Sequence, residues 1–217
     1  LTGNISPSIQ NLTNLQVLDI RGNNFSGTLP DLSILPNLNW LDISNNNFIF
    51  SDFENQFTTY QNNLSTFQFI PQANVTDNII EIINTGENLI LDTGLTSANN
   101  QYTWFFNGAQ LVDETGPSVT LDNIQAEQMG TYFCQITNSV VSGLALFTGE
   151  FVVGQDPTLS PDYNILVDLY NNTGGDNWTN NTNWLNPSIP LSGWHGITVD
   201  GNSVLRIALF NNNLQGS

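Results

Sequence analysis

The sequence predicts a mainly β, multidomain chain in which two segments of a repeat solenoid flank a β-sandwich, with one short helix at the start of the second solenoid segment. Apolar residues recur with a 23-residue spacing between residues 15 and 48, and a related pattern returns after residue 203. Between these segments, short apolar runs alternate with turn residues, which is typical of a sandwich of short strands. The length of 217 residues accommodates several small domains of this kind.

The first segment, residues 1–72, has apolar residues at the first, fourth and sixth places of a repeat and Asn at the ninth. Such a run points its apolar side chains into a narrow core, while the Asn amide satisfies backbone groups at the turn. The pattern resembles a leucine-rich repeat of the plant-type subclass, which also occurs in bacterial surface proteins. The matched residues are Leu15, Leu18, Ile20 and Asn23 in one turn and Leu38, Leu41, Ile43 and Asn46 in the next.

A last solenoid turn is predicted where Leu64, Phe67 and Phe69 restore the apolar spacing. The run from Phe67 to Gln72 resembles the closing segment of bacterial leucine-rich-repeat units. Pro71 marks the exit, because proline cannot donate a hydrogen bond to a strand ladder. We therefore expect this solenoid segment to end at residue 72.

Residues 73–153 are predicted to form the sandwich, with strands over residues 79–83, 89–91, 102–108, 118–121 and 130–134. This part resembles an immunoglobulin-like domain, since Trp104 matches the core tryptophan of the third strand and Tyr132, two residues before Cys134, matches the tyrosine corner. Thr93 stands at the position of the first cysteine of that family. The resemblance therefore implies a sandwich without an inter-sheet disulfide and with Cys134 in its core.

A linker and a short helix are predicted after the sandwich. The Gly and Pro content marks residues 154–161 as the linker. Asp162 is expected to be the N-cap of a helix whose apolar residues recur at helical spacing until Thr173, which two glycines follow. We expect this helix to open the last part of the chain, residues 162–217.

Residues 162–217 also combine tryptophans with a return of the repeat pattern. The tryptophans are Trp178, Trp184 and Trp194, and the repeat residues are Val204, Ile207, Leu209, Asn212 and Leu214. The combination resembles the N-terminal cap of bacterial leucine-rich-repeat domains, in which a helix and tryptophan-containing turns cover the exposed end of a solenoid. The resemblance implies that the tryptophans form the core of the cap and that a new solenoid begins there.

Composition indicates an extracellular protein without polyanionic partners. The chain has no Lys, its basic residues are Arg21 and Arg206, and its net charge is −17. This balance disfavours nucleic acid and anionic membranes as partners, and no apolar run approaches the length of a membrane-spanning helix. A lone cysteine is unusual for a secreted animal or plant domain of these types, which favours a secreted or cell-surface bacterial protein.

Few residues are candidates for catalysis or metal binding. His195 lies inside the cap motif and is expected to be structural, and Cys134 is expected to be buried and inert. No nucleophile elbow, phosphate loop or paired metal-ligand motif is present in the sequence. We therefore expect no enzyme, no cofactor and no assigned metal, with weak Ca²⁺ binding as an open alternative for acidic side chains. Those acidic candidates are Glu81, Glu87, Asp113, Glu114 and Asp176.

The leading functional expectation is a non-enzymatic structural or adhesive repeat protein. An alternative is a recognition module that binds a surface protein, peptide or glycan on the concave solenoid face, and an accessory part of a secreted hydrolase is less favoured. The predicted contact row consists of solvent-facing strand residues, which are small and polar except for one tryptophan. These residues are Gln16, Asp19, Arg21, Asn39, Trp40, Asp42 and Ser44.

The chain is also expected to join further copies of itself, either head-to-tail or as the continuation of a longer polypeptide. It begins in mid-repeat without a visible signal peptide, and residues 1–3 have the same repeat phase as residues 214–216. Open strand edges at a solenoid end favour stacking into an open assembly such as a filament. The predicted interface residues are Leu15, Leu18 and Ile20 on one side and Val204, Ile207 and Leu209 on the other.

Asn-x-Ser/Thr sequons are frequent in this Asn-rich chain. Many arise by chance in such a composition, and their asparagines would be glycosylated in a eukaryotic secreted protein but would usually stay bare in a bacterium. These asparagines are Asn4, Asn11, Asn24, Asn63, Asn74, Asn171, Asn177 and Asn180.

Overall fold

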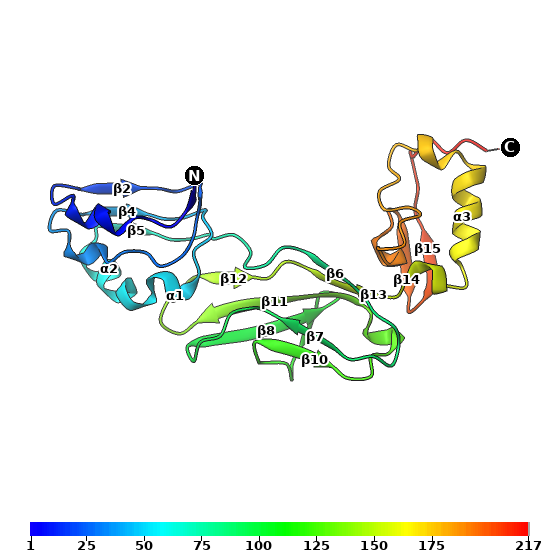
Figure 1. Cartoon of the computed structure of the whole chain (residues 1–217), viewed down its shortest axis with the longest axis horizontal. Helices are drawn as coiled ribbons and strands as arrows, with labels where there is room; N and C mark the ends of the chain where they lie inside the picture. Colours follow the sequence, from blue (N-terminus) through cyan, green and yellow to red (C-terminus); the bar gives the residue numbers. More distant parts are fainter. Residues whose placement is uncertain (217) are drawn as a thin grey trace.

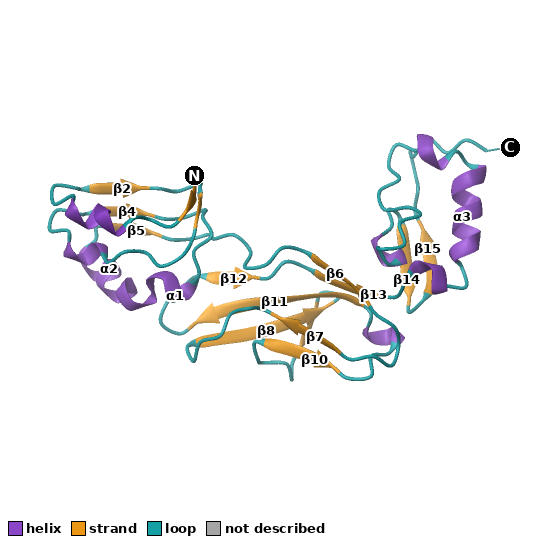
Figure 2. Ribbon diagram, viewed as in Figure 1, coloured by secondary structure: helices purple, strands orange, loops and turns teal. Residues whose placement is uncertain are grey.

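The computed structural model describes residues 1–216 and arranges them as three parts in a row. Figure 1 shows parallel strands at one end, a β-sandwich in the middle, and helix α3 with two strands at the other end. Figure 2 shows strands in every part, with the larger helices in the two outer parts. The fold is therefore mainly β and multidomain, and the order of the parts along the chain is also their order in space.

Parallel strands form one face of the N-terminal part. Val17, Trp40 and Thr66 lie in register on adjacent strands, so the register steps are 23 and 26 residues. These steps equal the spacing of the apolar pattern in the sequence, because each turn of chain adds one strand. The elements are β1 (Thr2–Gly3), η1 (Pro7–Asn11), β2 (Val17–Asp19), β3 (Asn24–Phe25), η2 (Leu32–Ile34), β4 (Trp40–Asp42) and β5 (Thr66–Gln68), with β1 pairing β3 and β2 and β5 flanking β4.

Helices follow β4, where the sequence predicts only a loosened repeat. They are α1 (Phe50–Phe53) and α2 (Phe57–Asn63), joined by the 3-10 turn η3 (Glu54–Gln56). They are additional to the one short helix that the sequence predicts in the C-terminal part. Phe57 packs edge-on against Phe69 with ring centroids 5.2 Å apart, and Tyr60 packs against Phe67 at 5.3 Å. An aromatic cluster thus replaces the aliphatic core at this end of the stack.

Two sheets form the central sandwich. One contains β6 (Ile79–Ile82), β13 (Phe151–Gly154), β11 (Gly130–Asn138), β8 (Asn100–Phe106) and β9 (Ala109–Leu111) in this order, with β12 (Ala145–Phe147) also on β11. The other pairs β7 (Leu89–Asp92) with β10 (Ser118–Leu121), and the 3-10 turn η4 (Ala126–Gln128) precedes β11. β6 runs parallel to β13, and the other pairs are antiparallel. The predicted strands are present, whereas β9, β12 and β13 extend the sheet beyond them.

The sandwich core is built around Trp104. Its indole is fully buried, and its Nε1 donates a hydrogen bond to the carbonyl oxygen of Gly116 at 3.0 Å. Cys134 lies opposite it on β11 and is equally buried. Thr93, at the position of the family's first cysteine, is also buried. The Tyr132 hydroxyl donates to the Gln128 carbonyl at 2.6 Å, which closes the corner before β11.

The C-terminal part packs a helix against three tryptophans and a hairpin. Trp184 lies 4.8 Å from Trp178 and 5.3 Å from Trp194 between ring centroids, and all three are buried. Within residues 1–216 no helix is long and apolar enough to cross a membrane. The elements are η5 (Pro157–Leu159), α3 (Tyr163–Asn172), η6 (Gly175–Asn177), η7 (Leu191–Gly193), β14 (Ile197–Asp200) and β15 (Ser203–Ile207).

The joint between the sandwich and the C-terminal part is more structured than the predicted linker. Gly154 ends β13, and a side chain there would meet Pro190 of the C-terminal part. Asp156 caps η5 by accepting the backbone N–H of Thr158 at 2.8 Å, and the hydrogen bonds from Thr158 lower the pKa of this carboxyl. Asp162 is the N-cap of α3 as predicted, but its carboxylate accepts the N–H of Val204 at 2.7 Å instead of a helix N–H. It therefore ties the start of α3 to β15.

Hydrophobic side chains of the described residues pack into two clusters. The N-terminal part and the sandwich share one continuous core cluster, which runs from Leu29 to Val153 among the described residues. The C-terminal part has a cluster of its own around Leu166 and Trp194. A side-chain hydrogen bond between Glu54 and Asn99 also links the first two parts. They are therefore expected to behave as one unit.

Candidate functional site

The exposed face of β2, β4 and β5 carries the predicted contact row. Side chains alternate along a strand, so Leu18, Leu41 and Phe67 join the core while their neighbours point outward. Val17 and Trp40 are 56% and 40% exposed, which places an apolar strip at this face. The next row across the strands consists of Asp19, Asp42 and Gln68, of which Asp19 and Gln68 are exposed and Asp42 is buried.

Arg21 holds the carboxylates of this face. Its Nε lies 3.6 Å from Asp19 Oδ2, and its Nη1 lies 3.5 Å from Asp42 Oδ2. Because the Arg21 side chain is 60% exposed, solvent screens both pairs and they contribute little to stability. Two carboxylates facing one guanidinium leave this part of the face with net negative charge.

Asp42 and Ser44 differ from the sequence prediction, which made them solvent-facing contact residues. The structure buries them, with 3% and 5% of their surface exposed. Asp42 Oδ1 accepts the backbone N–H of Ser44 at 3.0 Å and its hydroxyl at 2.6 Å, and Arg21 lies on the other oxygen. Their polar atoms are therefore used within the turn. The exposed members of the predicted row are Gln16, Asp19, Arg21, Asn39 and Trp40.

Asparagine side chains connect successive turns of the stack. Asn46 donates to the Ile20 carbonyl of the preceding turn at 3.0 Å. Gln72 has the same role one turn later, because its amide donates to Ile43 O at 3.0 Å and its Oε1 accepts Phe48 N–H at 3.1 Å. This role of Gln72 is not among the predictions from sequence. The sequence does contain a signal for it, because Gln72 follows Phe69 at the same spacing at which Asn46 follows Ile43.

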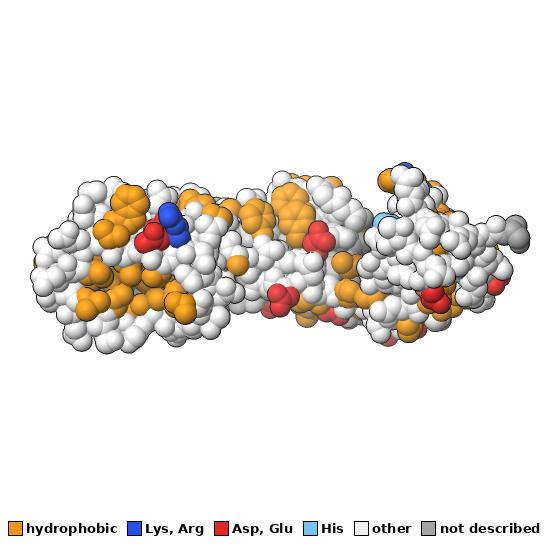
Figure 3. All heavy atoms as spheres, turned by 90° about the horizontal axis from the view of Figure 1, so that it is seen from above, with side chains coloured by type: hydrophobic (Ala, Val, Ile, Leu, Met, Phe, Trp, Pro, Cys, Tyr) orange, Lys and Arg blue, Asp and Glu red, His pale blue; other side chains and the backbone are white. Residues whose placement is uncertain are grey.

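The edge of β2 that faces away from β4 is open. Within residues 1–216 no strand pairs with this edge, and the core-facing residues Leu15, Leu18 and Ile20 are only half-buried. A hollow of about 310 Å³ lies beside them, lined by residues 11–15. Viewed from above, apolar side chains gather over this end of the molecule, next to a basic and an acidic group (Figure 3). The predicted interface residues on this side thus border an incompletely covered core.

The C-terminal part has a matching open edge on β15. β14 pairs with one side of β15, and no strand of the described chain pairs with the other. Val204 and Leu209 are half-buried against the tryptophan core, whereas Ile207 is 44% and Phe210 85% exposed. Asn212 is buried, with its Oδ1 accepting the N–H of Asn180 at 2.6 Å. The Asn212 amide also donates to the Asn180 carbonyl at 2.8 Å, so both ends of this side chain are bonded to Asn180.

The candidates for chemistry are held in structural contacts. The His195 ring lies 3.2 Å from the Asn180 amide, and the His195 carbonyl accepts the indole N–H of Trp184 at 2.9 Å. Burial raises the pKa of the Cys134 thiol to about 12, so it stays protonated and unreactive. The structure does not bring together Glu81, Glu87, Asp113, Glu114 and Asp176 as a metal site, because residues 1–216 contain no group of three or more potential metal-binding side chains.

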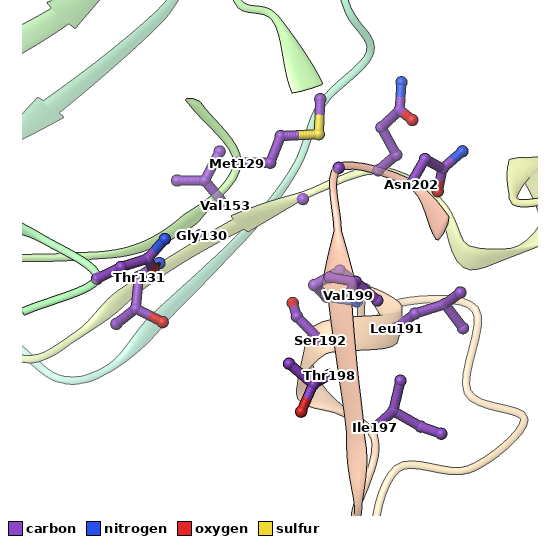
Figure 4. Close-up of a pocket in the computed structure, with 15 residues that line it drawn as sticks. Met129, Gly130, Thr131, Val153, Leu191, Ser192, Ile197, Thr198, Val199 and Asn202 are labelled. Carbon is purple, nitrogen blue, oxygen red and sulfur yellow. Dashed lines mark hydrogen bonds between the residues drawn. The ribbon is translucent and has the colours of Figure 1, made fainter. Parts of the chain in front are cut away.

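A pocket of about 250 Å³ lies between the sandwich and the C-terminal part. Figure 4 shows Met129, Thr131 and Val153 on the sandwich side and Leu191 and Val199 on the other. Its lining has hydroxyl groups from Thr131, Ser192 and Thr198 but no acidic, basic, His or Cys side chain that could activate them. The pocket therefore offers shape and neutral polar groups but nothing that could transfer a proton or hold a charge.

Likeness to known proteins is weak. No protein-family model matches the sequence, and no curated protein matches it. The chain is similar to a solved structure of titin kinase and its flanking domains, with 17% identity and a TM-score of 0.24 over 37% of this chain and 16% of that one. It is also similar to extracellular domains 3–5 of Drosophila OTK, with 17% identity and a TM-score of 0.23 over 37% and 33%. The chain spans 33% or less of the length of these structures.

Proposed function

We propose that the protein is a non-enzymatic, extracellular structural or adhesive module that assembles head-to-tail through solenoid edges. The N-terminal part is assigned as turns of a leucine-rich-repeat solenoid. Support comes from the 23-residue register between Val17 and Trp40 and from the bonds that Asn46 makes to the preceding turn. The C-terminal part is assigned as the cap and first strand of a further solenoid, supported by the burial of Asn212 against Asn180.

The central sandwich is assigned as immunoglobulin-like. Its larger sheet has the order β13, β11, β8, β9, and β7 and β10 form the second sheet. This order corresponds to strands G, F, C and C′ facing B and E of that fold. The buried Trp104 on β8 and the Tyr132 hydroxyl bond before Cys134 support the same assignment. In this role the sandwich is a rigid spacer between two solenoid segments.

The observation that carries head-to-tail assembly is the pair of open edges on β2 and β15. Both edges border half-buried apolar residues of the same repeat phase, so β15 of one unit can add in parallel beside β2 of the next. Stacking would bury Ile207 and cover Leu18. A contact between two different surfaces is heterologous and does not close on itself, so it extends into a thread.

Charge supports one register for this contact. In this register, Ile207 of one unit lies opposite Leu18 of the next unit. Arg206 then lies opposite Val17 and diagonal to Asp19, and Phe210 lies opposite Arg21. The acidic face of β2 would thereby gain a guanidinium, and the Arg21 guanidinium would gain an aromatic face. Both basic residues of the chain would be used at this junction.

The test is the size of particles formed at rising protein concentration. We expect light scattering and electron microscopy to show threads with a repeat of one unit for the unaltered chain and monomers for Ile207→Asp. Leu159→Asp, at a similarly exposed site on η5, should still form threads. Compact monomers of the unaltered chain at high concentration would contradict the proposal, as would equal loss of threads in both variants.

The exposed strip of Val17 and Trp40 favours a second candidate function, recognition of a peptide or glycan on the strand face. An exposed tryptophan beside polar groups is a common binding anchor. Glycan-array or peptide-library binding should then be lost in Trp40→Ala and retained in Ile207→Asp. Binding that survives Trp40→Ala would exclude this face.

A further inference from the structure

The outer face of the larger sandwich sheet has a hollow of about 430 Å³ lined by Asn74, Asn78, Phe133, Phe147, Thr148 and Glu150. Its apolar surface comes from aromatic rings. Phe147 is 39% exposed, and the half-buried Phe133 ring stacks on Phe105 with centroids 4.7 Å apart. Figure 3 shows apolar side chains grouped over the middle of the molecule, where most of the surrounding surface is uncharged.

Backbone hydrogen bonds hold Asn74 at the rim of this hollow. The N–H of Val75 donates to the Phe147 carbonyl at 2.8 Å, and the N–H of Gly149 donates to both the carbonyl and the hydroxyl of Thr76, at 3.1 and 3.0 Å. Asn74 itself is exposed, and its amide makes no hydrogen bond within residues 1–216. Asn74, Val75 and Thr76 form one of the sequons.

We propose that Asn74 is an N-glycosylation site whose first sugars pack on Phe147 and Phe133. The C–H faces of a pyranose suit aromatic rings, and its hydroxyls suit the amide of Asn78 and the carboxylate of Glu150 at the rim. The lining holds one acidic and no basic side chain, so a neutral sugar fits better than an acidic one. This inference does not depend on the head-to-tail assembly.

The reaction needs a polyprenyl-diphosphate-linked oligosaccharide as donor. A bond forms between Asn74 Nδ2 and the anomeric carbon of the first sugar, and the bond from that carbon to the diphosphate oxygen breaks. The lipid diphosphate leaves with the bonding electrons, and Nδ2 loses one proton. No oxidation or reduction occurs.

Three other sequons differ from Asn74 in their surroundings. The Asn180 amide lies 3.2 Å from His195 and its Oδ1 accepts the N–H of Thr182 at 3.0 Å. Asn24 lies in the paired strand β3. Asn171 is exposed on α3 and lines none of the described hollows, so it is the matched control.

The experiment secretes the chain from a host that attaches N-glycans and maps site occupancy by glycopeptide mass spectrometry. We expect Asn74 to be occupied, and Asn74→Gln to lower the melting temperature of the secreted protein by about 2–4 °C. Asn171→Gln should leave it unchanged. The same Asn74→Gln change in protein made by a host without glycosylation should have no effect, which separates the glycan from the side chain.

Phe147→Ser tests the packing. In this variant, which leaves the sequon intact, the melting temperature should no longer depend on the glycan at Asn74. The proposal is overturned if Asn74 stays bare while Asn171 is occupied. It is also overturned if the glycan at Asn74 gives no stabilisation, or if its stabilisation persists in Phe147→Ser.

Discussion

The side-chain oxygen of Asn46 accepts the backbone N–H of Phe25, in the preceding turn, at 3.0 Å. Its amide nitrogen donates to the carbonyl oxygens of Ile20, Ile43 and Ser44 at 3.0–3.2 Å. One buried side chain thus satisfies backbone groups of two successive turns. Asparagine suits this position because its short side chain carries two N–H donors and an acceptor oxygen.

Replacing Asn46 should therefore destabilise the N-terminal part strongly. Asn46→Ala leaves several buried backbone groups without partners, and we expect a loss of about 3 kcal/mol in the free energy of unfolding. Urea denaturation followed by circular dichroism measures this. Asn47→Ala, at an exposed neighbouring position, should change the value by less than about 0.5 kcal/mol. Equal effects of the two changes would show that the side-chain bonds between turns are unimportant.

Trp104 should be the most costly single residue of the sandwich to truncate. Trp104→Ala removes a fully buried indole and leaves the Gly116 carbonyl unpaired, so we expect a loss of about 3–5 kcal/mol. Thermal melting measures the effect, with Trp40→Ala as a control at a 40% exposed tryptophan. An unchanged melting curve for Trp104→Ala would show that the core lies elsewhere.

Reducing agent should not alter the melting temperature of the unmodified chain, because Cys134 is its single cysteine.

The residues that sequence predicted well are those whose signal is local. Tyr132 and Cys134 are two residues apart on β11, and the buried Trp104 fixes the orientation of β8, the strand that carries it. The 23-residue period likewise predicted the register of Val17 and Trp40, because the length of one turn determines which residues become neighbours.

The failures come from contacts between turns. Successive side chains of a strand point to opposite faces, and Leu41 and Ile43 point into the core. This alternation predicts that Asp42 and Ser44 face solvent. Their burial depends on the bonds of Asp42 with Ser44 and with Arg21, which lies 21 residues away. Helices α1 and α2 have a readable signal in the sequence. Phe50, Phe53, Phe57 and Tyr60 follow a helical period, and all four are buried.

Asp52 should make stability depend on pH. Burial raises the pKa of its carboxyl above the ordinary value of 3.8, although hydrogen bonds from the Ile49 and Gly27 backbone oppose the shift. The folded state therefore binds this proton more tightly than the unfolded state. The stabilisation is complete below the unfolded pKa and is lost as pH rises through the folded pKa.

Asp52→Asn removes this titration while keeping an acceptor for the Ile49 N–H. We expect the melting temperature of the variant, relative to the unaltered chain, to increase as pH rises from about 3 to about 7. Asp122→Asn, at an exposed carboxyl, controls for the general loss of negative charge. A difference between Asp52→Asn and the unaltered chain that is independent of pH, or that matches Asp122→Asn at every pH, would contradict the assignment.

Salt should stabilise this protein, because 19 carboxyl groups face two guanidiniums. The Arg21 pairs with Asp19 and Asp42 weaken on screening, but they are few and the Arg21 side chain is 60% exposed, so the relief of repulsion dominates. We expect the melting temperature to rise between about 10 mM and about 150 mM NaCl, where the Debye length falls from about 30 to about 8 Å.

Arg21→Gln should steepen this rise, since it leaves Asp19 and Asp42 facing each other without a cation. CaCl₂ at equal ionic strength should add little if no carboxylates chelate the ion. A flat salt response would show that surface repulsion is unimportant, and a response specific to Ca²⁺ would reveal a bound ion.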